Sequence, residues 1–142
     1  MGEQTLYDRL GGSAAIMAVV EDFVRRCAAD SRINGKFART DVPRLKAKLI
    51  EQVSAATGGG VEYTGRTMRE THDSMGVTAG EFNALVEDLA ATLDQFRVPQ
   101  EDQAELVSIL APLRPDIVEV ESPVTGTPLP EAYQNAKPLA AV

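Results

Sequence analysis

The sequence is poor in the residue types that hold metal ions and act as catalytic nucleophiles. Among 142 residues there is one histidine, His72, one cysteine, Cys27, and no tryptophan. Zinc sites draw most of their ligands from several His or Cys side chains, so these two residues exclude the usual zinc motifs. A lone Cys27 also excludes an internal disulfide bond and is typical of a protein in a reducing cytoplasm.

Long apolar runs and an excess of positive charge are also missing. No stretch approaches the roughly 20 apolar residues that a membrane-spanning helix requires, and the first residues lack the basic and apolar features of a signal peptide. The formal net charge is −7, whereas nucleic-acid binding depends on clustered Lys and Arg side chains. We therefore expect no membrane span, no nucleic-acid partner and a cytoplasmic location.

Motifs of several large enzyme classes are absent as well. The sequence contains no Gly-x-Ser-x-Gly motif of the hydrolases, no Walker phosphate-binding loop and no dinucleotide-binding glycine pattern. The run Gly58–Gly60 lacks the Lys-Ser/Thr pair that would follow in a phosphate-binding loop. It is interpreted as a break between two helices.

The residues that are present favour one helical domain. Apolar residues make up 44% and charged residues 25% of the chain, which is an ordinary balance for a globular protein. Apolar positions recur at helical spacing, with Ser13 as the expected N-cap of one helix, Pro43 in the first turn of another, and a capping box formed by Thr78 and Glu81. The predicted fold class is all-α, with helices over about residues 13–27, 43–56, 63–75, 78–96 and 99–113.

The periodic pattern ends near residue 120. Residues 121–142 contain several prolines, from Pro123 to Pro138, and little periodic apolar content. A segment of this composition does not bury enough apolar surface to fold by itself. We therefore expect a globular domain over residues 1–120 and a flexible Pro/Ala-rich C-terminal tail over residues 121–142.

Three features of the N-terminal half form an ordered set: Leu6–Gly12, Val20–Phe23 and the eleven-residue spacing from Phe37 to Lys48. They resemble the N-terminal half of the group I truncated haemoglobins, a family of small globins. The strongest similarity is in Tyr63–His72, the stretch that carries the proximal histidine in the family. The resemblance extends from residue 5 to about residue 118, and the order and spacing of the motifs make it specific.

The resemblance implies a two-over-two helical sandwich around haem b, with His72 as the proximal iron ligand. Without the resemblance, His72 on a short polar helix would be interpreted as a surface residue, and Phe37 as an anchor between its loop and the core. Arg44 and Lys46 are expected near the haem propionates. The residues expected to contact the haem are Phe37, Thr40, Arg44, Leu45, Lys46, Leu49, Met68, Val77, Phe82 and Leu110.

The expected distal side of the haem site departs from the family pattern. Members that stabilise bound oxygen usually carry a tyrosine and a glutamine at the positions that here hold Val24 and Leu49, and neither of these side chains donates a hydrogen bond. Lys48 either binds the sixth site of the iron as a neutral amine or is a solvated lysine that covers the haem edge. The expected distal pocket comprises Val24, Leu45, Lys48, Leu49 and Gln52.

The sequence leaves three functions open. The first is a globin that reversibly binds O₂, NO or CO, in which the lack of a distal donor weakens oxygen binding and favours a redox or nitrosative-stress role. The second is a nitric-oxide dioxygenase or peroxidase that works with a reductase, for which only Lys48 and Gln52 could supply stable oxygen binding or acid–base help on the distal side. The third is a globin-like interaction domain without haem, which the presence of His72 and Phe37 disfavours.

Overall fold

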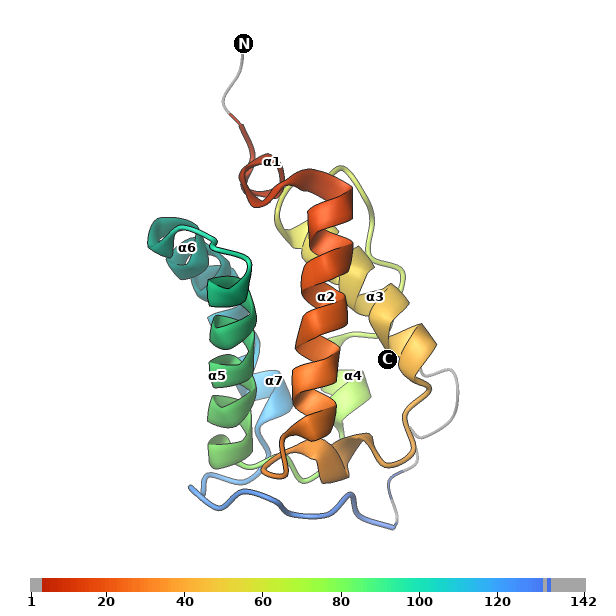
Figure 1. Ribbon diagram of the computed structural model, residues 1–142. Coiled ribbons are helices and arrows are strands. Elements are labelled where there is room, and N and C mark those ends of the chain that lie inside the picture. Colours follow the sequence, from red (N-terminus) through yellow and green to blue (C-terminus); the bar gives the residue numbers. More distant parts are fainter. Residues whose placement is uncertain (1–3, 132, 134–142) are drawn as a thin grey trace.

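The described part of the chain is mostly helical (Figure 1). The computed structural model describes residues 4–131 and 133, and within them no β-strand forms; the only β-type pairing there is an isolated bridge between Thr78 and Val120. This confirms the predicted all-α class. In chain order the elements are α1 (Leu6–Leu10), α2 (Gly12–Ala29), the 3₁₀ helix η1 (Asn34–Phe37), α3 (Val42–Ala56), α4 (Met68–His72), α5 (Ala79–Gln95), α6 (Gln100–Leu110), the 3₁₀ helix η2 (Ala111–Leu113) and α7 (Arg114–Ile117).

Polar side chains set the starts of several helices. The predicted capping box is present at α5, where Thr78 Oγ1 accepts from Glu81 N and the Glu81 carboxylate accepts from Thr78 N, both at 3.0 Å. At α3, Asp41 caps the helix and Pro43 lies in the first turn, as predicted. Each cap satisfies backbone N–H groups that have no partner within the helix, and this fixes where the helix begins.

The junction between α1 and α2 differs from the prediction. Ser13 is not the N-cap of α2, because α2 already begins at Gly12 and its N-cap is Gly11. Gly11 has a φ of 111°, and its N–H bonds to carbonyls of α1. A Cβ atom at Gly11 would lie 2.6 Å from the Cβ of Ala15. Glycine therefore lets α1 end and α2 start at the same residue, without the intervening cap that a serine would provide.

Helix α2 is the centre of the packing, with α3 on one side and α5 on the other (Figure 1). Between α2 and α3 lies a buried apolar cluster, which we call the α2–α3 cluster; its buried members are Ile16, Val20, Val24 and Leu45. A second cluster joins α1, α5 and α6 through Leu6, Leu93 and Leu106. Burial of these side chains supplies the main stabilisation of the fold. None of the helices in the described part of the chain combines the length and apolar character needed to cross a membrane.

The C-terminal segment, defined here as residues 121–131 together with Tyr133, lies along the ends of α2 and α5 (Figure 1). It contains no helix or strand, and hydrogen bonds join it to the rest of the described chain. Glu81 Oε2 accepts from Thr127 N at 2.7 Å and from Thr127 Oγ1 at 2.6 Å, and Arg32 O accepts from Gly126 N at 2.7 Å. These hydrogen bonds hold the segment in place, although its apolar residues do not recur at a regular spacing. Residues 132 and 134–142 of the predicted tail lie outside the described residues.

Two carboxyl groups, Asp30 at the C-terminal end of α2 and Asp88 in the middle of α5, share one guanidinium group. Arg32 Nη2 is 2.9 Å from Asp30 Oδ2 and 3.9 Å from Asp88 Oδ1. Asp88 Oδ2 is buried and accepts no hydrogen bond within the described residues, whereas a proton on Asp88 would let it donate to Asp30. Burial and the neighbouring Asp30 raise the pKa of Asp88 to about 6. The hydrogen bonds from Arg32 lower the pKa of Asp30 to about 2.

We expect Asp88→Asn to stabilise the protein at pH 8 by roughly 1–3 kcal/mol. A raised pKa means that protonated Asp88 stabilises the fold at low pH, and this stabilisation is lost as the pH rises through about 6. The asparagine amide can donate to Asp30 at every pH, so its advantage should shrink as the pH falls from 6 towards 4. Urea unfolding across pH 4–8 measures this, with Glu62→Gln as an exposed control. An equal gain in the control would show an effect of net charge alone.

Candidate functional site

The imidazole of His72, the last residue of α4, is held in one tautomer. Its Nδ1 lies 2.8 Å from the carbonyl oxygen of Met68, one turn earlier. A carbonyl only accepts hydrogen bonds, so Nδ1 carries the proton and the lone pair is on Nε2. Burial lowers the pKa of His72 below its usual range, which keeps the ring neutral near pH 7. A neutral imidazole with a free Nε2 is the form that binds a metal ion.

One imidazole by itself does not make a protein metal site. Within the described residues, no group of three or more His, Cys, Asp or Glu side chains is arranged to hold a metal ion. A metal bound by His72 must therefore bring other ligands with it, as the iron of a porphyrin does. Haem needs one imidazole from the protein on one side of its iron, and His72 can supply it, so the residues of this chain fit haem.

A capping box fixes the start of the helix that carries His72. Thr67 Oγ1 accepts from Glu70 N at 3.1 Å, and the Glu70 carboxylate accepts from Thr67 N at 3.0 Å. Arg69 of α4 pairs with Asp116 of α7 at 3.0 Å. This box is readable in the sequence as Thr67-x-x-Glu70, in the same pattern as the box of α5.

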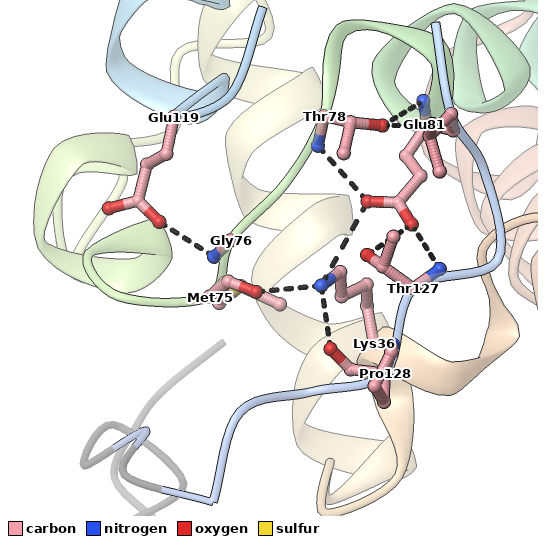
Figure 2. A network of polar contacts seen from close by, with 9 residues as sticks. Lys36, Met75, Gly76, Thr78, Glu81, Glu119, Thr127 and Pro128 are labelled. Atoms are coloured by element: carbon pink, nitrogen blue, oxygen red, sulfur yellow. Dashed lines mark hydrogen bonds and ion pairs between the residues drawn. The ribbon is translucent and has the colours of Figure 1, made fainter. Parts of the chain in front are cut away.

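The loop after His72 is held by one carboxylate. Glu119 accepts from Ser74 N at 2.8 Å and from Gly76 N at 2.6 Å (Figure 2). Ser74 and Gly76 both have positive φ, of 69° and 71°. Glu119 thus satisfies two N–H groups of a tightly turned loop, and it links the end of α4 to the segment that follows α7.

The structure brings together most of the predicted distal residues. Val24 and Leu45 are buried members of the α2–α3 cluster, and Phe37 and Leu49 pack against it. Phe37 also packs against a neighbouring cluster around Cys27. Both interpretations of Phe37, as a core anchor and as a haem contact, therefore keep their support.

The other predicted apolar contacts are divided between two places. Val77 is buried beside Met75 with Phe82 packed against them, in the region that follows α4. Met68 is partly exposed at the start of α4. Leu110 lies elsewhere, in the cluster that joins α1, α5 and α6, so the structure does not bring it together with the others.

The predicted polar contacts all lie on or beside α3, and two of them have other partners. Lys48 Nζ donates to Thr64 Oγ1 at 2.8 Å and is 3.6 Å from Glu51 Oε2. Lys46 Nζ donates to Glu21 Oε2 of α2 at 2.6 Å. In this structure the ammonium group of Lys46 is therefore bound to α2, and that of Lys48 to the loop that precedes α4. Of the remaining predicted residues, Thr40 and Gln52 are partly exposed and Arg44 is exposed.

Two residues near the site were missed in the sequence. Lys36 is buried, and its Nζ donates to Met75 O at 2.8 Å, two residues before Val77 (Figure 2). Tyr133 is buried, and its hydroxyl donates to Thr71 O at 2.6 Å, next to His72. A tyrosine within a proline-rich segment was the available signal, because a large aromatic side chain gains stability when it is buried. Nothing in the local sequence distinguishes Lys36 from a surface lysine.

Comparison with known proteins finds relatives over most of the chain. The family model described as bacterial-like globin matches residues 5–119. The group 1 truncated hemoglobin GlbN of Mycolicibacterium paratuberculosis is 39% identical over 118 residues, which are 83% of this chain and 87% of that protein.

Solved structures of similar proteins have the same fold. Truncated hemoglobin from Tetrahymena pyriformis in its Fe(III) form matches with a TM-score of 0.78 and 31% identity, over 81% of this chain and 98% of that one. The 2/2 hemoglobin from Synechococcus sp. PCC 7002, in the cyanomet state and with covalently attached heme, matches with a TM-score of 0.77 and 34% identity, over the same shares of the two chains. The predicted two-over-two helical fold is confirmed.

Replacement of His72 tests its assignment as the metal ligand. We expect His72→Gly to leave the far-ultraviolet circular dichroism of the apoprotein almost unchanged and to accelerate haem loss by more than about 100-fold, because loss of an outer-shell partner already weakens metal binding roughly 10- to 100-fold. Transfer of haem to an acceptor globin measures the rate. Free imidazole should slow the loss again by occupying the vacated position. Unchanged haem retention in the variant would contradict the assignment.

Proposed function

Because the chain belongs to the bacterial-like globin family and, within it, to the group 1 truncated haemoglobins, it is a haem-binding globin, and we propose that it reversibly binds diatomic gases at an iron held by Nε2 of His72. The observation that carries this proposal is the hydrogen bond from Nδ1 to Met68 O, which leaves Nε2 free and the ring oriented. When bound, haem would supply the iron that binds the gas, and His72 would hold that iron through Nε2.

We propose haem b, held without a covalent bond to the protein. His72 is the only histidine and Cys27 the only cysteine of the chain. Cys27 is buried in a cluster with Ile33 and Ala84, and burial raises the pKa of its thiol well above the usual range. An un-ionised, buried thiol is a poor nucleophile. With His72 assigned to the iron, neither residue is suited to attach the porphyrin.

An apolar distal side is proposed to set the ligand preference. Val24, Leu45 and Leu49 belong to or pack against the α2–α3 cluster, and as the proposed lining of this side they carry no hydrogen-bond donor. Dioxygen becomes partly anionic on binding and needs a donor, whereas CO and NO depend on one less. Gln52, one turn beyond Lys48 on α3, is the candidate amide donor. A role in redox or nitrosative stress, supported by a cytoplasmic reductase, fits these residues better than oxygen transport.

Lys48 is proposed to compete with gases for the sixth site of the iron. Its amine, now bonded to Thr64 and close to Glu51, must leave these partners and lose its proton before it can bind iron. If both states are populated, the apparent affinity for a gas falls by the fraction of molecules with an open site. Binding of Lys48 to Thr64 and Glu51 therefore favours the open state.

The resting visible spectrum distinguishes these states. If Lys48 binds the iron, the haem-loaded protein is low-spin in the ferric and the reduced states at pH 8, and Lys48→Ala converts it to a five-coordinate, high-spin ferrous form. Glu51→Gln, which removes a competing carboxylate, should increase the low-spin fraction. Lys46→Ala is the matched control, because Lys46 is bound to Glu21 of α2. A spectrum that is the same for the parent and Lys48→Ala at every pH shows that Lys48 does not bind the iron and is a solvated lysine that covers the haem edge.

A further inference from the structure

The backbone carbonyl of Thr71, the residue before His72, has no hydrogen-bond donor within α4. The last carbonyls of any α-helix have no N–H donor within the helix, and α4 ends at His72. The hydroxyl of Tyr133 donates to Thr71 O at 2.6 Å, and this bond is buried. A residue 62 positions further along the chain thus completes the end of the helix that carries the proximal histidine.

The ring of Tyr133 is fixed from several sides. Tyr133 is 8% exposed and packs in one cluster with Met75 and Val77. The guanidinium group of Arg39 lies 6.0 Å from the centre of the ring, and its Nη2 donates to Pro130 O at 3.1 Å and to Tyr133 O at 3.3 Å. Packing and the hydrogen bonds from Arg39 to the backbone around Tyr133 therefore fix the ring whose hydroxyl reaches Thr71.

A second contact joins the C-terminal segment to the loop after His72. Lys36 Nζ donates both to Met75 O at 2.8 Å and to Pro128 O at 2.9 Å, so one ammonium group bridges the loop and the C-terminal segment (Figure 2). Lys36 is in turn 3.9 Å from Glu81, and the side chains of this ion pair are only 5% and 1% exposed. A buried ammonium group needs hydrogen bonds and an opposite charge, and it has both.

A third contact fixes the C-terminal segment to α5, at a distance from α4. Glu81 Oε2 accepts from both Thr127 N and Thr127 Oγ1, while its Oε1 caps the helix through Thr78 N (Figure 2). The Glu81 carboxylate thus both caps α5 and binds the C-terminal segment. Movement of the segment at Thr127 would leave Glu81 Oε2 without these two donors.

We infer that the C-terminal segment positions the proximal helix, and that Tyr133 is a positioning residue for the bond between His72 and the haem iron. The inference rests on the proposed assignment of His72 as the iron ligand. The family model ends at residue 119, so this support comes from residues outside the matched globin region. Orientation of a ligating imidazole by groups beyond the metal tunes the metal–ligand bond. Displacement of α4 changes the iron–imidazole bond without any contact between Tyr133 and haem.

The test is Tyr133→Phe in the full chain, which removes one hydroxyl and keeps the ring. We expect amide hydrogen exchange in α4 and at Met75 to accelerate roughly two- to tenfold, the range that one hydrogen bond supplies. In the haem-loaded ferrous protein, the iron–histidine stretching band should shift or broaden in resonance Raman spectra. Tyr7→Phe removes a hydroxyl from α1 and should change neither measurement.

A second variant separates the action of the whole segment from a local effect at Tyr133. Thr127→Val removes one hydrogen bond to Glu81, and we expect the same changes in α4 and in the Raman band, but smaller. Parent-like exchange in α4 and a parent-like Raman band in both variants would overturn the inference. If the parent takes up no haem, the proposed function fails, while the exchange measurement on the apoprotein still decides whether the segment holds α4.

Discussion

The position of His72 depends on a helix that cannot hold itself in place. Helix α4 has five residues, whereas isolated helices shorter than about 12 residues are marginal in water. Its geometry therefore comes from its surroundings, through the Thr67 cap at the start and the hydrogen bond from Tyr133 at the end. The free Nε2 of His72 is a product of this arrangement, because the bond from Nδ1 to Met68 O exists only while the single turn of helix is intact.

The buried ion pair of Lys36 and Glu81 explains how a segment without apolar periodicity becomes part of the structure. Charged groups that leave water are stable only when each is paired and hydrogen-bonded. The C-terminal segment supplies some of these hydrogen bonds, because Pro128 O accepts from Lys36 and Thr127 donates to Glu81. The segment and the ion pair therefore stabilise each other, and neither is expected to keep its structure without the other.

The sequence predicts well the features that depend on local pattern. The α5 cap by Thr78 and the position of Pro43 in α3 follow from neighbouring residues, and both are confirmed. Contacts between a side chain and a distant backbone leave no such pattern, which is why the attachment of Tyr133 to Thr71 was not foreseen. A helical wheel similarly assigns Lys46 to a face of α3 but not to Glu21, since the partner lies on another helix.

The proximal and distal sides of the proposed haem site are held by different parts of the chain. A change in the contacts of one side therefore need not alter the other. Residues after α7 hold α4, whereas the loop before α4 holds Lys48 through Thr64. To reach the iron in the proposed closed state, Lys48 must leave both Thr64 and Glu51, because contacts of 2.8 Å and 3.6 Å now hold its amine. Changes to Thr64 or Glu51 are therefore expected to act on the distal side and to leave the bond between Tyr133 and Thr71 unchanged, because the two sets of contacts share no residue.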